Sequence, residues 1–402
     1  MVREIAITIY LILFKLIFNI FKIFSLKDKV VFVVTFGDNS KYVYDEIRKR
    51  NTGTETVVLF KGTSHLHFRS YQDLTLIPFE TINIISQVKS IYHLATSKYI
   101  FVDNYFGFLA ETKFKPEVEC IQLWHASGAI KKFGLQDESI KARSPKAKQR
   151  FLKVYEKFDR VVVGSDVMAN IFKEAFNLSN EKIVRTGIPR TDFFFDKKRQ
   201  NEVISAFYSK YPNMKAKKKI LYAPTYRDNE IDSFKLKLEL DKMQDELGED
   251  FVLLLRLHPA VRNNSDYSQV YPGFVYDFSS TEFDINELLL LTDFLITDYS
   301  SVPYDFSLLG KPMIFFAYDL EEYKKERGLW DQYETMLPGP VVKETKEIII
   351  AIKNNNFNVE EIKRYSKKWN KYSIGSSSEN LVDFLFEKEP SKVYQTEKAS
   401  YY

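Results

Sequence analysis

The chain has 402 residues, of which 45% are hydrophobic and 28% are charged, and its formal net charge is +4. This composition excludes a disordered protein, and so small a net charge does not support nucleic-acid binding. The single cysteine, Cys120, excludes a disulfide framework and a zinc-thiolate cluster, and it predicts a reducing, cytosolic environment. A chain of this length is expected to form two domains.

The N-terminal residues 5–24 form an apolar stretch that polar side chains interrupt. Lys15, Asn19 and Lys22 share one face of a helix because they are spaced by four and then three residues. A helix that spans a bilayer would bury Lys15 near the centre, at a cost of roughly 3 kcal/mol. We therefore expect residues 1–28 to form an amphipathic helix in the membrane interface. A spanning helix and a buried domain helix are the alternatives.

Basic residues gather in two later segments, 141–153 and 215–219. Beside an amphipathic anchor, such residues are attracted to anionic lipid by about 1 kcal/mol per charge. Solvated faces are the alternative interpretation. The first segment contains Lys141, Arg143, Lys146, Lys148, Arg150 and Lys153.

Strand-like and helix-like stretches alternate through both halves of the chain. This alternation predicts an α/β fold of two doubly wound, Rossmann-like domains that face each other across a cleft. We expect domains at 29–195 and 196–390, a polar linker region at 192–219, and a last helix that packs on its own domain or back on the first. The expected strands are 30–35, 56–59, 99–102, 120–123, 160–163 and 183–185, then 220–223, 251–257, 274–276, 294–297 and 313–316.

One histidine in each half stands at the end of a predicted buried strand. His125 follows the strand at 120–123, and His258 follows the apolar run at 251–257. Ligands of parallel α/β sheets bind outside the carboxyl ends of the strands, so both imidazoles are expected to face the same cleft. The alternative is that each is a hydrogen-bonded histidine without a catalytic role.

Several other strand ends carry groups suited to an anionic ligand. Ser300 and Ser301 precede Pro303, a pattern typical of a helix N-terminus that binds phosphate or is merely capped. Asp298, close by, would repel a phosphate if it were exposed. Arg227 offers a planar fork of donors for phosphate, with an ion pair to Asp228 as the alternative.

Two further basic sites are less specific. Arg327 either closes over a diphosphate or pairs with Glu321 or Glu322. Lys131 and Lys132 follow His125 closely, where they either order an anionic substrate or are solvated.

The sequence has no Asp-x-Asp pair, no His or Cys cluster with metal-ligand spacing, no Walker loop and no Gly-rich dinucleotide fingerprint. We therefore expect phosphoryl transfer without a metal or other cofactor. Positive charge would come from Arg, Lys and His side chains and from helix N-termini.

Four ordered motifs together resemble the CDP-glycerol glycerophosphotransferases of teichoic acid synthesis, over residues 30–368. They are WH at 124–125 with KKFG at 131–134, YAPTYRD at 222–228, LHP at 257–259 and ITDYSS at 296–301. The resemblance implies a GT-B-like fold and peripheral binding to the cytoplasmic face of the cell membrane in a Gram-positive-type bacterium. It makes 29–195 the acceptor-side domain and 196–390 the nucleotide-binding domain.

The resemblance also implies roles for individual residues. The two motif histidines fall on His125 and His258, and the nucleotide phosphates would lie against the second domain. We expect His125, in the domain nearer the anchor, to be a general base with a pKa near ambient pH. The expected substrate-binding residues are Thr225, Arg227, Asp298, Ser300, Ser301, Arg327, Lys131 and Lys132.

Ala126-Ser127-Gly128 follows the first histidine where the family's polymerases usually have Gly, so the chain looks most like the primases. Primases move sn-glycerol 3-phosphate from CDP-glycerol to the N-acetylmannosamine of an undecaprenyl-diphosphate-linked disaccharide and release CMP. The expected partners are these two substrates and anionic membrane lipid. The alternatives are a poly(glycerol or ribitol phosphate) polymerase, a GT-B sugar-nucleotide glycosyltransferase and an inactive membrane-bound interaction protein.

Overall fold

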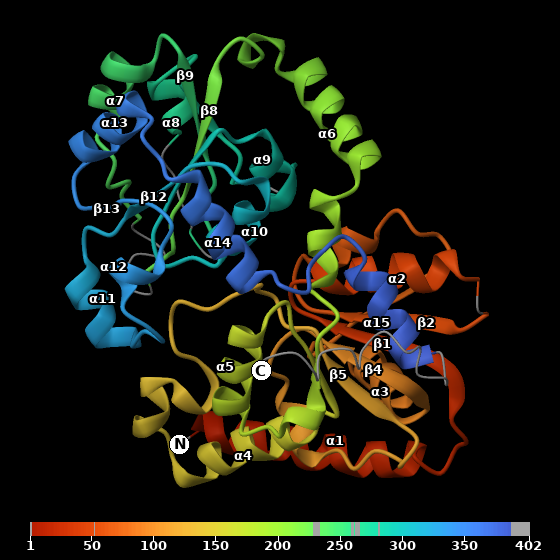
Figure 1. Cartoon of the computed structure of the whole chain (residues 1–402). Helices are drawn as coiled ribbons and strands as arrows, with labels where there is room; N and C mark the ends of the chain where they lie inside the picture. Colours follow the sequence, from red (N-terminus) through yellow and green to blue (C-terminus); the bar gives the residue numbers. More distant parts are fainter. Residues whose placement is uncertain are drawn as a thin grey trace, which may run out of the picture.

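The computed structural model describes residues 2–51, 53–227, 234–258, 261, 266–279 and 282–386. They form two α/β domains, the first in the lower half of Figure 1 and the second in the upper half, each built on its own parallel sheet. The predicted pair of doubly wound domains is confirmed.

The sheet of the first domain has seven strands in the order β3-β2-β1-β4-β5-β6-β7. Residues 30–34 of the central strand β1 are apolar and fully buried, as expected for a parallel strand that is covered on both faces. The strands are β1 (Lys27–Val34), β2 (Glu55–Phe60), β3 (Thr75–Pro78), β4 (Ser97–Val102), β5 (Glu119–Gln122), β6 (Arg160–Val162) and β7 (Ile183–Val184).

The sheet of the second domain has six strands in the order β10-β9-β8-β11-β12-β13. The segments of Arg227, His258 and Ser300 follow the neighbouring strands β8, β9 and β11, so all three emerge from the same edge of this sheet. The strands are β8 (Lys218–Ala223), β9 (Phe251–Leu255), β10 (Val275–Asp277), β11 (Phe294–Thr297), β12 (Met313–Phe316) and β13 (Val341–Val342).

Helices cover both sheets, and several begin at the side-chain caps that their sequences predict. Ser144 and Ser165, for example, accept hydrogen bonds from backbone N–H groups in the first turns of α4 and α5. The α-helices are α1 (Val2–Phe21), α2 (Asp38–Lys49), α3 (Ile84–Ala95), α4 (Pro145–Glu156), α5 (Asp166–Phe176), α6 (Lys197–Lys210), α7 (Leu240–Leu247), α8 (Tyr267–Val270), α9 (Ile285–Leu291), α10 (Val302–Phe306), α11 (Leu320–Arg327), α12 (Tyr333–Met336), α13 (Thr345–Asn354), α14 (Val359–Trp369) and α15 (Ser377–Phe386).

The predicted linker at 192–219 is mostly regular structure. It contains the end of a 3₁₀ helix, η6 (Pro189–Phe194), and the whole of α6. Asp196 caps α6, and Val203 and Phe207 bury one side of it, so a polar composition here marks a partly exposed helix. The predicted domain boundary at 195/196 lies between η6 and α6.

The chain passes between the domains twice. Helix α6 leads into the second domain, and the segment after α14 leads back to the first, where α15 packs against α2 (Figure 1). The two passages touch, since the Ile188 amide donates to Ser373 Oγ at 3.0 Å and the Ser377 amide donates to the Asp192 carboxylate at 2.8 Å. The two connections therefore lie side by side.

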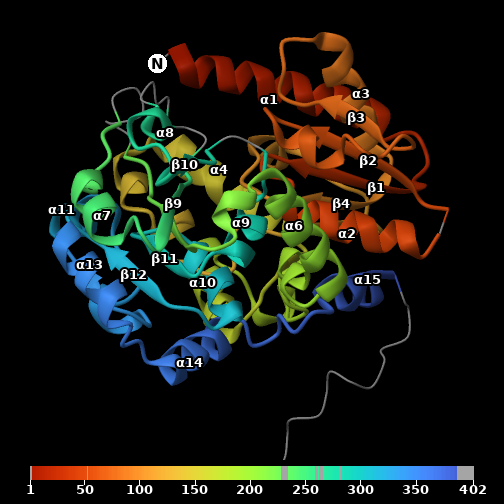
Figure 2. The same ribbon diagram turned by 90° about the horizontal axis from the view of Figure 1, so that it is seen from above.

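Helix α1 lies along the outer edge of the first domain (Figures 1 and 2). Leu11, Phe14 and Phe18 are buried in the domain core, while the opposite side of the helix faces outward. By length and composition alone, Glu4–Phe21 would suffice to cross a membrane. Lys15, on the predicted polar stripe, pairs with Glu111 at 2.9 Å, so this stripe contacts the domain beside α1.

Candidate functional site

The structure brings the two histidines to the boundary between the domains. His125 lies just beyond β5 and His258 just beyond β9. Lys131 lies close enough to both imidazoles for its charge to disfavour their protonated forms. Lys131 is therefore near both strand-end positions.

His125 is held in one orientation and one tautomer. Its Nδ1 lies 3.1 Å from the backbone carbonyl oxygen of Asp103, and a carbonyl only accepts, so Nδ1 carries the hydrogen. The ring lies between the side chains of Phe36 and Trp124, with ring centroids 4.2 and 4.5 Å away. Nε2 therefore has the free lone pair that a base needs.

The pKa of His125 differs from the expected value near ambient pH. Burial, and then the charges of Arg190 and Lys131, lower it to about 4, although the bond to Asp103 works in the opposite direction. The imidazole is therefore neutral at physiological pH and ready to accept a proton, but it is a weaker base than a solvated histidine. The sequence could not reveal this shift because its causes come from distant segments.

The backbone next to His125 is strained. Trp124 has a φ of 55°, a left-handed conformation that is rare for a bulky residue. Its amide donates to Gln122 Oε1 at 2.8 Å, and its carbonyl accepts from Asn39 Nδ2 at 2.9 Å. These bonds hold the turn that directs the imidazole out of the sheet edge.

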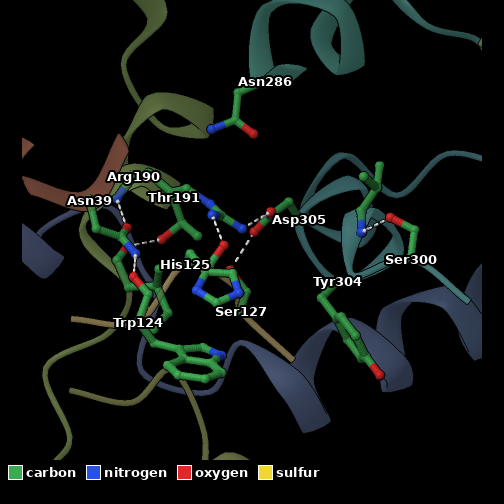
Figure 3. A network of polar contacts seen from close by, with 12 residues as sticks. Asn39, Trp124, His125, Ser127, Arg190, Thr191, Asn286, Ser300, Tyr304 and Asp305 are labelled. Atoms are coloured by element: carbon green, nitrogen blue, oxygen red, sulfur yellow. Dashed lines mark hydrogen bonds and ion pairs between the residues drawn. The ribbon is translucent and has the colours of Figure 1, made fainter. Parts of the chain in front are cut away.

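A buried ion pair connects the His125 segment to the second domain (Figure 3). Arg190 in η6 donates from Nη1 to the carbonyl of His125 at 2.5 Å and from Nη2 to Asp305 Oδ2 at 2.6 Å. Ser127 Oγ donates to Asp305 Oδ1 at 2.5 Å. Asp305 belongs to α10, so this network, which our sequence analysis missed, joins the base segment to the helix that follows Ser300.

Gly128 lets the domains approach closely at the same place. A Cβ atom on this residue would lie 2.5 Å from ring atoms of Tyr304 in α10. The side chain of Tyr304 is fully buried. A glycine is therefore required here for steric reasons.

His258 lies at the open side of the boundary. Its ring centroid is 4.5 Å from that of Tyr226, which follows β8. Partial withdrawal from water, and then the charges of Lys131 and Arg256, lower the pKa of His258. Pro259, the next residue of its motif, lies outside the described residues.

Arg227 is largely occupied by protein groups. It donates to both carboxylate oxygens of Asp319, at 2.8 and 3.0 Å, to Asp298 at 3.1 Å and to the carbonyl of Thr225 at 2.6 Å. Four of the five N–H groups of an arginine are used in this way. The alternative partner Asp228 lies outside the described residues. Arg227 as a direct phosphate ligand stays a prediction, but its contacts are those of a residue that positions this loop.

Asp298 is buried and acts on the backbone. Its Oδ1 accepts from the amides of Thr225 and Tyr299, each at 2.7 Å. It is therefore not exposed to repel a phosphate, which was the condition raised by the sequence. The side chain of Thr225 also interacts with the Asp298 carboxylate, so this residue is held at the strand end through both its amide and its hydroxyl.

The serine pair after β11 begins α10 as predicted, with divided roles. Ser301 is the N-cap residue but its side chain makes no capping bond, whereas Ser300 Oγ accepts from the Val302 amide at 3.2 Å. Both residues are half-buried. Ser300 and Ser301 as substrate ligands stay predictions.

The basic segment after His125 pairs with the second domain through its backbone. Lys131 forms an antiparallel bridge with Leu329, and the Lys132 amide donates to the carbonyl of Gly328 at 3.1 Å. Trp330 donates its amide to Ile130 at 3.0 Å. Arg327 ends α11 directly before this pairing, so the structure brings Lys131, Lys132 and Arg327 to one edge of the boundary.

One group among the described residues has the arrangement of a metal-ligand set. Ligand atoms of Asp38, His67 and Asp284 all lie within 4.8 Å of one another, and Asp284 comes from the second domain. His67 Nε2 lies 3.2 Å from Asp38 Oδ1. Spacing along the sequence could not reveal this group, and transfer without a metal stays a prediction.

The fold is that of a two-domain GT-B-like protein, and the site places a neutral imidazole at the domain boundary. Residues 16–387 match the model of the family CDP-Glycerol:Poly(glycerophosphate) glycerophosphotransferase. The chain belongs to this family and is a transferase of teichoic acid biosynthesis, as its four motifs predicted.

Known relatives include both primases and polymerases. The chain is 36% identical to the teichoic acid glycerol-phosphate primase of Bacillus subtilis (strain 168), over 89% of this chain and 92% of that protein. It is 34% identical to the teichoic acid poly(ribitol-phosphate) polymerase of Bacillus spizizenii, over 94% of this chain but 60% of that protein. The solved structure of the wall teichoic acid polymerase TagF superimposes with a TM-score of 0.79 at 25% identity, covering 96% of this chain and 97% of that one.

Proposed function

We propose that this protein moves sn-glycerol 3-phosphate from CDP-glycerol to the N-acetylmannosamine of an undecaprenyl-diphosphate-linked disaccharide and releases CMP. The observation that carries the proposal is the match to the glycerol-phosphate primase, which extends over nearly all of both chains. Ala126 after the first motif histidine also supports a primase.

In the proposed reaction, a hydroxyl of the acceptor sugar attacks the phosphorus that carries glycerol. A new P–O bond forms to the acceptor, and the bond from that phosphorus to the oxygen bridging to CMP breaks. His125 Nε2 takes the hydroxyl proton, because Nδ1 is already committed to the Asp103 carbonyl. CMP leaves with the bridging oxygen and its electron pair.

The donor diphosphate would lie against the second domain. His258, the side chain of Thr225 and the start of α10 at Ser300 and Ser301 are the groups that would contact it. Arg227 would act by holding the Thr225 segment through Asp298. Lys131, near both histidines, would balance charge as the diphosphate is cleaved.

The acceptor is lipid-linked, and we propose that α1 holds the protein in the plane of the cytoplasmic membrane surface. Its buried stripe of Leu11, Phe14 and Phe18 supports a helix that lies on the domain, and its outward apolar side supports contact with lipid. The basic residues of α4 lie beside it, since Lys146 bonds to Thr8 and Arg150 to Glu4. Neutralising these bases should weaken binding to anionic vesicles.

The proposal is tested by incubating the purified protein with a short-chain disaccharide diphosphate acceptor and CDP-glycerol, CDP-ribitol or a UDP-sugar. We expect release of CMP with CDP-glycerol and a product that is heavier by one glycerol phosphate. A ladder of products would indicate a polymerase. Release of CMP from CDP-ribitol but not from CDP-glycerol would indicate a ribitol-phosphate primase. Absence of CMP release with both CDP donors, or release of UDP from the UDP-sugar in their place, would overturn the proposal.

A further inference from the structure

The outward side of α1 is too apolar for a surface that meets only water. Ile9, Leu13, Leu16 and Ile20 are 54%, 54%, 56% and 59% exposed, and they lie opposite the stripe that packs into the core. The fold does not use these side chains, because the helix is attached through the buried stripe and through contacts on its two flanks. Continuous exposed apolar surface of this kind marks a contact with another phase or partner.

A second element adds to this surface. Ile82, Ile84 and Ile85, at and before the start of α3, are 101%, 76% and 68% exposed. Three such isoleucines within four positions do not stabilise the domain. We call them the α3 tip.

The α3 tip lies beside α1. Near one end of the pair, the Phe21 ring of α1 contacts Tyr92 of α3 at a centroid distance of 5.5 Å. Toward the other end, Glu80, just before the tip, is close enough to contribute to a raised pKa of Tyr10, after burial. The two helices therefore run alongside each other, and Figures 1 and 2 show them at the same edge of the first domain.

The opposite flank of α1 is basic. Lys146 and Arg150 of α4 bond to Thr8 and Glu4 of α1, and Lys141 and Arg143 before α4 are exposed. An apolar strip bordered by lysine and arginine matches the acyl region and the anionic headgroups of a bilayer. Glu4, Glu111 and Glu138 pair with some of these bases, but lysine and arginine remain in excess on this flank, which a second protein copy would not require.

We propose that the α3 tip inserts into the membrane together with the outward side of α1, so that two elements, not one helix, dock the first domain on an anionic bilayer. One helix in the interface leaves the protein free to roll about the helix axis. A second insertion point beside it removes that freedom and fixes the direction in which the domain boundary faces the lipid-linked acceptor. This inference rests on the proposed in-plane position of α1.

The test compares binding of the full chain to vesicles of phosphatidylglycerol and phosphatidylethanolamine by co-sedimentation. We expect the triple variant I82S/I84S/I85S to lose more than roughly tenfold in partition coefficient, because each buried isoleucine is worth at least about that factor. Ile374→Ser is the matched control, since Ile374 is 67% exposed but lies beyond α14, away from α1. Equal binding of the triple variant and the wild type would overturn the proposal.

A spectroscopic measurement locates the tip directly. Cys120 is buried, so a fluorophore on Ile84→Cys labels one site, and Ile374→Cys provides the labelled control. We expect a blue shift and quenching by spin-labelled lipid for position 84 and neither for position 374. A probe at 84 that stays in water, or a lipid-free dimer that the triple variant dissociates, would contradict insertion.

Activity separates this inference from the proposed reaction. The triple variant should release CMP at the wild-type rate with a water-soluble short-chain acceptor and slowly with a vesicle-borne acceptor. Wild-type protein that binds vesicles through the α3 tip but releases no CMP would refute the reaction and leave the docking surface intact.

Discussion

His125 shows how a fold can fix the tautomer and the orientation of an ordinary side chain. The Asp103 carbonyl selects the tautomer, and the rings of Phe36 and Trp124 restrict the imidazole. The sequence located this residue because a histidine directly after an apolar, strand-like run can be recognised without the structure. It did not reveal Arg190 or Asp305, which are 115 positions apart and meet only when the domains pack.

The pH dependence of the reaction should reflect the lowered pKa of His125. Because burial disfavours the imidazolium, the folded protein keeps the base neutral until the pH falls to about 4, and not to the ordinary 6.5. We expect the acid limb of kcat/KM for CDP-glycerol near pH 4, measured by CMP release. Circular dichroism over the same range separates this limb from acid unfolding, and a limb near 6.5 in folded protein would contradict the assignment.

Removing the imidazole should abolish most of the chemistry without preventing folding. General-base assistance is worth about 10²–10⁴-fold, so His125→Ala should lower kcat by a factor in that range. His65→Ala is the control, since His65 contacts only its own turn through the Gly62 carbonyl and the neighbouring Phe60 ring among its described contacts. A kcat within a few-fold of wild type for His125→Ala would exclude it as the base.

At the scale of elements, the long apolar strands were predicted correctly, whereas β3 and β13 were missed. β3 (Thr75–Pro78) is a four-residue edge strand that contains a proline, and β13 is a two-residue edge strand that directly follows Pro340. Helix α6 was taken for part of a linker because most of its side chains face water. The secondary structure of these three elements depends on the segments they pack against, and those segments cannot be identified from the sequence alone.

The turn after β5 and helix α10 must stay in close contact for the site to form. Gly128→Ala places a Cβ within 2.5 Å of the Tyr304 ring and must displace one of them. Because a displacement of about 1 Å at a reacting centre can cost roughly 10²-fold, we expect a loss of that order in kcat/KM. Gly107→Ala is the control, since its Cβ would meet nothing within 4 Å. Full activity of Gly128→Ala would show that this contact does not position the base.

Replacing one partner of the Arg190–Asp305 pair should reduce the free energy of unfolding strongly, and replacing both should reduce it by less than the sum of the two single losses. Both side chains are buried, so either Arg190→Gln or Asp305→Asn leaves an uncompensated charge at a cost of about 3–5 kcal/mol. The double variant should lose less than the sum of the two, as measured by urea unfolding. The exposed pair Lys363–Glu360 provides the control double-mutant cycle, for which we expect a coupling energy of about 0–1 kcal/mol. Additive losses at Arg190 and Asp305 would contradict direct coupling.

For the whole molecule, the two-domain architecture followed from the alternation of strands and helices, but the contacts between the domains did not. Asp38, His67 and Asp284 illustrate this, since the potential ligand set exists only in the assembled protein. Because this group could hold a metal ion, the prediction of metal-independent transfer can be tested directly at these residues.

Metal removal should leave the reaction unchanged. If positive charge comes from Lys131, His258 and the start of α10, dialysis against a chelator should leave CMP release within about twofold of the untreated rate. Asp284→Asn should behave in the same way, with Asp241→Asn as the exposed control. Loss of activity on chelation that Mn²⁺ or Mg²⁺ restores in the wild type, but not in Asp284→Asn, would make this group part of the reaction.

The two chain passages between the domains are hydrogen-bonded to each other, and this limits how the molecule can open. Adjacent connections are the arrangement expected of a single hinge, about which the two domains would swing. A short backbone pairing joins the two domains at another edge of the boundary, between Lys131 and Leu329 and between Lys132 and Gly328. Entry of a nucleotide and departure of its product would be governed by release of that short strand pair, which makes product exit a candidate for the slowest step of turnover.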